Sequence, residues 1–237
     1  MVYIVLILML ALPFAYSENK FSTIWKVVSG MAIMGIIIAG SRMALFSLPI
    51  LLLIFLYLRG KLTIKHIMII TGLSVSFLIL VQEFFPGTYL SSRIHQGFSD
   101  PVRIQLWVSA IKYFLESCNQ SFGIGVGNSM LIDIEAYYDY WNPRWPTTLD
   151  NTHQVYLDML IERGFLGLAT FITFIGLIMK RSWSRLKEYP IHLSVFLMSS
   201  SILLMGLANI TFRYEFALLF VCIAGLSFNK ALISKTY

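Results

Sequence analysis

Charged residues are scarce in this sequence, and their scarcity excludes an ordinary soluble domain. Only 13% of the 237 residues are charged, while 57% are hydrophobic. Soluble domains are about one quarter charged. The mean hydropathy is +0.75, and long apolar runs alternate with short polar connections. This composition predicts an integral membrane protein.

Cysteine and nucleotide-binding signatures are almost as scarce. Cys118 lies in a predicted loop and Cys222 in an apolar run, and they are the only two cysteines, so neither a disulfide framework nor a zinc site is indicated. The glycines of residues 123–127 lack the GxGxxG spacing and the lysine of a phosphate-binding loop, and we interpret them as a tight turn. We therefore expect no metal, no cofactor and no nucleic-acid partner.

The apolar runs predict an all-α fold with about seven transmembrane helices. A helix needs roughly 20 apolar residues to cross a bilayer, with a range of about 17–25. The candidate spans are residues 1–16, 24–41, 43–58, 66–82, 162–179, 191–209 and 214–229. A single long polar segment interrupts them. We therefore divide the chain into N-terminal transmembrane helices (1–82), a loop that carries the catalytic motifs (83–152) and C-terminal transmembrane helices (153–237).

The basic residues predict the orientation of these spans. Lysine-rich connections follow the third and fifth spans, at residues 59–65 and 180–187, and the positive-inside rule places both in the cytoplasm. The long loop then faces the opposite side, where arginine replaces lysine as the main cation: Arg42, Arg93, Arg103, Arg144, Arg163 and Arg213. Because arginine grips phosphate or carboxylate at two points, this bias favours a bound anion. Pairing with the acidic residues of the loop is the alternative.

The loop contains a predicted amphipathic helix with a candidate anion ligand in its first turn. Asp100 and Pro101 form a helix start, and apolar residues then recur at helical spacing: Ile104, Val108, Ile111 and Leu115. Arg103 lies in the first turn, where the helix dipole disfavours a cation but favours a bound anion. We interpret Arg103 as part of an anion site. Local neutralisation by Asp100 remains the alternative.

A histidine at the start of the next helix is the candidate general base. Asp150, Asn151 or Thr152 can cap that helix, which places His153 at or near its first turn. Gly164 is expected to interrupt the helix before the fifth span. The positive end of the helix dipole disfavours imidazolium, and a neutral imidazole can accept a proton. A structural histidine is the alternative reading, but the nearby arginines favour catalysis.

Several short motifs together resemble a known family. They are Gly40-Ser-Arg-Met-Ala44, Arg103-x-x-x-Trp107, Phe122-Gly-Ile-Gly-Val-Gly127, His153-x-x-Tyr156-Leu157 and Glu162-Arg-Gly-Phe-Leu-Gly167. Their order around one outer loop, over about residues 35–180, resembles the superfamily of O-antigen ligases and O-antigen polymerases. The chain departs from the family in having Gln154 where asparagine is common. It also has fewer spans than the usual dozen or so, which leaves open an N-terminally truncated member.

The resemblance implies a GT-C-like fold and a metal-independent glycosyltransferase of lipopolysaccharide biosynthesis in the bacterial inner (cytoplasmic) membrane. The implied donor is a glycan on undecaprenyl pyrophosphate, and the implied acceptor is a sugar hydroxyl of lipid A-core at the periplasmic face. His153 would take the acceptor proton, and Arg42 and Arg103 would hold the pyrophosphate. Trp107, Tyr156 and Arg144 would complete the substrate site.

Three alternatives to a ligase remain open at this point. A polymerase of the same superfamily would use another glycan repeat unit as acceptor. A polysaccharide transporter or flippase subunit is disfavoured, because transporters place charges within their spans and these span interiors are almost free of charge. The third alternative is an inactive truncated relative.

Overall fold

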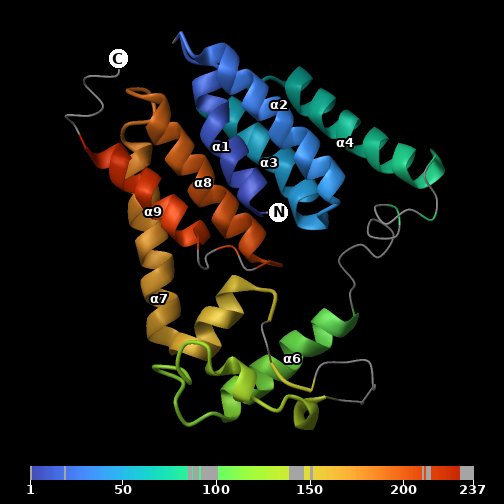
Figure 1. The fold of residues 1–237 in the computed structure, drawn as a ribbon, viewed down its shortest axis with the longest axis vertical. Helices are drawn as coiled ribbons and strands as arrows, with labels where there is room; N and C mark the ends of the chain where they lie inside the picture. Colours follow the sequence, from blue (N-terminus) through green and yellow to red (C-terminus); the bar gives the residue numbers. More distant parts are fainter. Residues whose placement is uncertain are drawn as a thin grey trace. The chain divides into compact units, whose positions relative to one another are not determined.

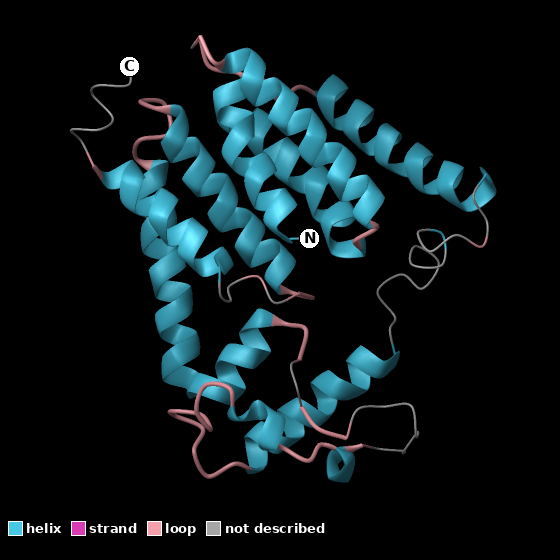
Figure 2. Cartoon of the chain, in the orientation of Figure 1, coloured by secondary structure: helices cyan, strands magenta, loops and turns pink. Residues whose placement is uncertain are grey.

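A computed structural model describes residues 2–18, 20–84, 87, 91, 101–138, 147–149, 152–209, 211 and 215–229. Within these ranges the secondary structure is helical, apart from one antiparallel bridge between Asp133 and Thr148 (Figures 1 and 2). The α-helices are α1 (Val2–Ala15), α2 (Ser22–Ala39), α3 (Arg42–Leu58), α4 (Ile64–Phe84), α6 (Pro101–Glu116), α7 (Val155–Trp183), α8 (Pro190–Gly206) and α9 (Glu215–Phe228). Two short 3₁₀ helices follow α6: η1 (Asn128–Leu131) and η2 (Glu135–Tyr137).

The prediction of an all-α fold is confirmed for the described residues, and the apolar helices are consistent with a membrane protein. Each of the seven predicted spans coincides with an apolar helix. Three of these helices, α2, α4 and α7, are long and apolar enough to cross a membrane, and the other four are shorter. The helical fold suits lipid, because a helix pairs its own backbone polar groups. The number of seven crossings stays a prediction.

The chain forms two compact units. The first unit comprises Met1–Gly97, Leu177–Met205 and Thr211–Tyr237, and the second comprises Phe98–Gly176 and Gly206–Ile210. Every predicted site residue except Arg42 belongs to the second unit.

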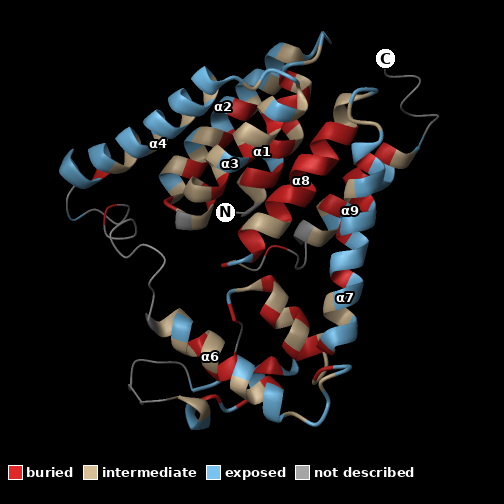
Figure 3. Ribbon diagram, turned by 180° about the vertical axis from the view of Figure 1, so that it is seen from behind, coloured by how far each residue is buried: buried red, intermediate tan, exposed pale blue. Residues whose placement is uncertain are grey.

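In the first unit, α8 is the most buried helix and α4 is the most exposed one. Residues along almost the whole of α8 are buried, as Figure 3 shows. Ser194 of α8 donates from its hydroxyl to the carbonyl of Leu10 in α1 at 2.8 Å. By contrast, Val81 is the one residue of α4 that is buried. The exposed apolar surface of α4 is the kind of surface that faces lipid in a membrane protein.

The second unit is built on α6, which packs into the unit with a face other than the predicted apolar stripe. Its start at Pro101 agrees with the prediction. Leu106, Ala110 and Phe114 are buried, in a cluster that also holds residues from α7 and from the segments before it. Ile104 and Ile111, which belong to the predicted apolar stripe, are exposed, with 44% and 45% of their surface accessible. Both faces of α6 are therefore apolar in part, and the placement of the exposed stripe against the membrane or the helix bundle stays a prediction.

Candidate functional site

The helix α7 breaks at Gly164, and this break organises the candidate site. Gly164 has φ 65° and ψ −169°, a conformation that is essentially restricted to glycine. The predicted interruption of the helix at this residue is confirmed. The break removes helical hydrogen bonds on both sides, so the freed backbone groups must find other partners.

Residues 120–125 supply those partners with their own backbone. The amides of Ile124 and Gly125 donate to carbonyls before the break, and amides after the break donate to carbonyls of residues 120 and 121. The four bonds are Ile124 N–Ile161 O (3.0 Å), Gly125 N–Glu162 O (2.9 Å), Phe165 N–Gln120 O (3.0 Å) and Leu166 N–Ser121 O (3.2 Å). The glycine-rich segment thus docks on the break, in addition to making the predicted turn.

Two glycines allow the two backbones to approach so closely. A Cβ atom on Gly123 would lie 2.5 Å from the backbone nitrogen of Arg163 and the carbonyl oxygen of Ile161. A Cβ on Gly164 would collide with the backbone of Ser121. Both glycines also have positive φ, 71° and 65°. Glycine at these two positions is therefore required by contact and by conformation together.

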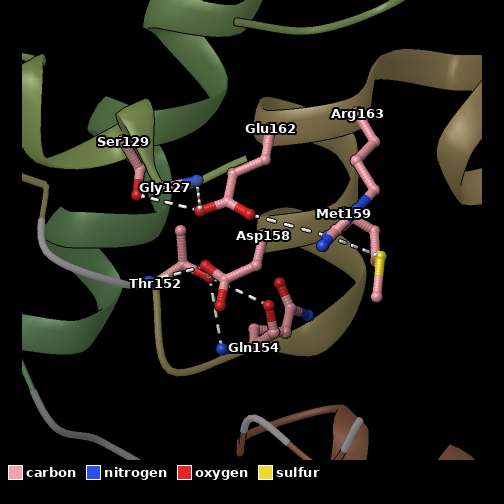
Figure 4. Close-up of polar contacts among 8 residues, drawn as sticks. All are labelled: Gly127, Ser129, Thr152, Gln154, Asp158, Met159, Glu162 and Arg163. Carbon is pink, nitrogen blue, oxygen red and sulfur yellow. Dashed lines mark hydrogen bonds and ion pairs between the residues drawn. The ribbon is translucent and has the colours of Figure 1, made fainter. Parts of the chain in front are cut away.

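Glu162 ties the same loop to α7 through its side chain. The residue is only 6% exposed, and its Oε1 accepts from the Gly127 amide and from the Ser129 hydroxyl, both at 3.2 Å (Figure 4). Its Oε2 lies 3.6 Å from a guanidinium nitrogen of Arg163. Because the Glu162 carboxylate is buried and committed to these contacts, it is a poor alternative to a histidine base.

A second carboxylate, Asp158, holds the chain just before α7. Its Oδ1 accepts from the Thr152 amide at 2.8 Å and from the Thr152 hydroxyl at 2.6 Å. The Thr152 hydroxyl oxygen in turn accepts from the Gln154 amide at 3.2 Å. Thr152 is 1% exposed, so these bonds lie in a protected place, where they are stronger than in water. Figure 4 shows the group.

His153 lies between Thr152 and Gln154, whose amides make the bonds just described, and outside the helix α7. His153 lies near the first turn, as predicted, and precedes the helix, because α7 begins at Val155. It is the one non-glycine residue of the described ranges with positive φ, 54°, and its side chain is exposed. Such a conformation is uncommon outside glycine, although histidine adopts it more often than most residues. The backbone here is strained, as is frequent at functional sites.

Trp107 anchors the same segment from α6. Its indole Nε1 donates to the carbonyl of Thr152 at 2.7 Å, and its ring packs against the buried cluster of the second unit. The structure therefore brings Trp107 and the residue before His153 together. Its predicted contact with substrate stays a prediction.

Arg103 is placed in the first turn of α6, as predicted. Its guanidinium donates to the carbonyl of Ala208 at 3.2 Å, a residue of the same unit. Asp100, the proposed local partner of Arg103, lies outside the described residues. The bond to Ala208 fixes where the guanidinium points, but it does not test whether Arg103 binds an anion.

The remaining predicted site residues are described only in part. Arg42 is the first residue of α3, and the Ser41 hydroxyl caps this helix by accepting from the Ala44 amide at 3.4 Å. The Arg42 side chain and all of Arg144 lie outside the described residues. Tyr156, in the first turn of α7, is half-buried and has its ring edge-on to Phe171 at 6.3 Å between centroids.

The site as described can present a proton acceptor on a rigid support. His153 supplies an exposed imidazole, while Asp158, Trp107 and Thr152 hold its backbone. In the described ranges, no three histidine, cysteine or acidic side chains gather as ligands for a metal ion. The role of Asp158 was missed from the sequence. The available signal was an acidic residue in the first turn of a helix, a position that favours carboxylates.

Comparison with known protein families matches residues 27–172 to the family described as O-antigen ligase. A comparison with curated proteins finds no match. The matched range is more than half of the chain and includes the Ser41 cap, α6, the glycine-rich segment, His153 and the break in α7.

Proposed function

The chain belongs to the O-antigen ligase family, and from this we propose that it moves a glycan from undecaprenyl pyrophosphate to a sugar hydroxyl of lipid A-core. The proposed place is the periplasmic face of the bacterial inner membrane. Members of this family are glycosyltransferase-like enzymes of lipopolysaccharide biosynthesis. The donor, the acceptor and the side of the membrane belong to the proposal.

The observation that carries the proposal is the exposed His153 in its left-handed backbone conformation. A base that meets a bulky glycan must project from the protein surface, and it must be held still to act at a defined distance. His153 meets both conditions, because its side chain is exposed and residue 152 is bonded to α6 and α7.

The proposed reaction is a displacement at the anomeric carbon of the donor. An imidazole nitrogen of His153 takes the proton of the acceptor hydroxyl while the hydroxyl oxygen bonds to the anomeric carbon. The bond from that carbon to the pyrophosphate oxygen breaks, and undecaprenyl pyrophosphate leaves with the electron pair. Arg42 and Arg103 stabilise its negative charge. Trp107, Tyr156 and Arg144 are assigned to binding the sugars and the pyrophosphate.

The surface glycan of a deletion strain tests this function. Loss of a ligase leaves long glycan chains on the lipid carrier, and complementation with the wild-type chain moves them to lipid A-core. Core that carries a single repeat unit after deletion would instead identify a polymerase, which uses a second repeat unit as acceptor. Unchanged glycan on both lipids would reject transfer altogether.

A further inference from the structure

The contacts around Thr152 give a role to a residue outside the family motifs. We propose that Asp158 is a positioning residue that holds His153 in its strained conformation, and this role rests on the proposed function of His153. Asp158 does not need to touch substrate for this role. It acts through the backbone on either side of the histidine.

Three links connect Asp158 to His153. First, one carboxylate oxygen accepts two bonds from Thr152, from its amide at 2.8 Å and its hydroxyl at 2.6 Å. Second, the amide of Asp158 donates to the carbonyl of Gln154 at 3.0 Å. Third, the Gln154 amide donates to the Thr152 hydroxyl oxygen at 3.2 Å. Thr152 and Gln154, the residues before and after His153, are therefore both hydrogen-bonded to Asp158, and they are also bonded to each other.

A charged acceptor suits this place. Hydrogen bonds to an ionised carboxylate are shorter and stronger than bonds between neutral groups, and a carboxylate is favourable in the first turn of a helix. The strain at His153, with φ 54°, persists only when surrounding contacts determine the conformation. Trp107 adds one such contact at the Thr152 carbonyl, and Asp158 provides the other two through Thr152.

Replacing Asp158 tests this role in the full-length protein in detergent. Asp158→Ala removes the acceptor, so we expect kcat to fall by about 10- to 100-fold, because small displacements of a catalytic group have effects of this size. KM should change little. Asp158→Asn keeps an acceptor oxygen in the same place and should restore most of the rate. The donor is the lipid-linked glycan that accumulates in a strain lacking the protein.

Hydrogen exchange gives a readout that does not depend on catalysis. Asp158→Ala should speed amide exchange in the peptide that contains Thr152 and Gln154. The Thr152 amide loses its acceptor, and the Thr152 hydroxyl, which accepts from the Gln154 amide, is no longer held by the carboxylate. Asp133→Ala is the matched control: it removes a similar carboxylate bond, to the Glu135 amide at 3.0 Å, elsewhere in the same unit. The control should leave both the exchange around Thr152 and the rate unchanged.

The outcomes separate this role from the proposed function. If His153→Ala is inactive but Asp158→Ala keeps the wild-type rate per folded molecule, the positioning role of Asp158 is wrong. The role of His153 as the general base is then retained. If Asp158→Asn is as slow as Asp158→Ala while exchange around Thr152 is normal in both, Asp158 acts in another way. A wild-type rate for His153→Ala rejects the base and the positioning role together.

A separate feature of the first unit is an open cavity of about 620 Å³ between α1, α3 and α4. Its walls are apolar and include Leu12, Leu52 and Ile70, while the basic lining residues Arg59, Lys61 and His66 come from the end of α3, the connection after it and the start of α4. None of the residues that line it is acidic. Cavities of roughly 300–1,000 Å³ are typical of small-molecule sites.

From this pairing of apolar walls with basic residues, we infer that the cavity binds an anionic phospholipid. Arg59 is fixed beside the cavity, because its guanidinium donates to the carbonyl of Tyr16 at 3.0 Å. The ring of His66 is oriented by Thr63, whose hydroxyl lies 2.7 Å from Nδ1. Basic pockets between membrane helices bind anionic head groups, and the apolar walls suit an acyl chain.

Thermal unfolding with added lipid tests this site. Phosphatidylglycerol in mixed micelles should raise Tm by a few degrees per tenfold rise in concentration, while phosphatidylcholine should have little effect. The double variant Arg59→Gln/Lys61→Gln should lose the increase in Tm. Ile70→Trp, which obstructs the apolar part of the cavity and keeps the cations, should reduce it as well. The control variant Lys180→Gln/Lys187→Gln removes the same amount of charge elsewhere and should keep the increase in Tm.

Two results would overturn the lipid site. An equal response to phosphatidylglycerol in the wild type and in both cavity variants would show that the lipid acts elsewhere. A response to inorganic phosphate alone that matches the response to the lipid would show that the acyl chain has no part in binding.

Discussion

Gly164→Ala should destabilise the second unit strongly, because alanine fits neither the conformation nor the space at this residue. The conformation of φ 65° and ψ −169° costs a non-glycine residue about 1–3 kcal/mol. The new Cβ also collides with the backbone of Ser121, so the bonds from Phe165 and Leu166 to residues 120 and 121 must lengthen, at about 0.5–1.5 kcal/mol each. We expect a loss of roughly 2–6 kcal/mol in the free energy of unfolding.

Unfolding in detergent, followed by tryptophan fluorescence, measures this loss. Gly176→Ala in the same helix is the matched control, because no heavy atom lies within 4 Å of its added Cβ. In a helix interior this exchange should stabilise by about 0.5–1 kcal/mol. If the Gly164 variant is as stable as the Gly176 variant, the docking of residues 120–125 on the break does not stabilise the protein, and our account of the site is wrong.

Three further predictions concern chemistry and topology. His153→Asn should remain folded, since asparagine tolerates the left-handed conformation, and should lose about 10²- to 10⁴-fold in transfer rate; a wild-type rate per folded molecule would exclude His153 as the base. Arg42→Lys and Arg103→Lys should each lose most activity, because lysine keeps the charge without the two-point fork; near-normal transfer by both variants would reject pyrophosphate binding by these side chains. A cysteine at position 140 should react with an impermeant reagent in intact spheroplasts and one at position 65 should not; the reverse pattern would overturn the periplasmic placement of the loop.

The sequence predicted the helices better than it predicted how they pack. The start of α6 was found because Pro101 is a strong local signal, and the break at Gly164 was found because glycine interrupts the apolar pattern. One apolar stripe of α6 was found from its spacing, but the second apolar face, with Leu106 and Phe114, which packs into the unit, was not singled out. Which stripe is buried depends on residues far along the chain.

The candidate site was predicted as a set of residues but not as a geometry. His153 and Trp107 were singled out from the motifs, yet the bond from Trp107 to Thr152 joins residues 45 positions apart. The left-handed conformation of His153 depends on that bond and on Asp158, whose side chain turns back towards Thr152. Local propensity carries no information about either contact. The docking of residues 120–125 was missed for the same reason.

The docking of residues 120–125 on the break in α7 also fixes an order of events during synthesis. The Gly127 amide and the carboxylate that it meets are 35 residues apart, so the earlier segment leaves the ribosome without its partners. It must wait until the start of α7, Val155–Arg163, and the break have followed. Loop closure of this kind comes late in folding, because its entropy is lost before its contacts are gained. The glycine-rich segment is therefore docked only after the start of α7 and the break have been made, and a nascent chain that stops short of Gly164 lacks the two bonds that Phe165 and Leu166 donate to residues 120 and 121.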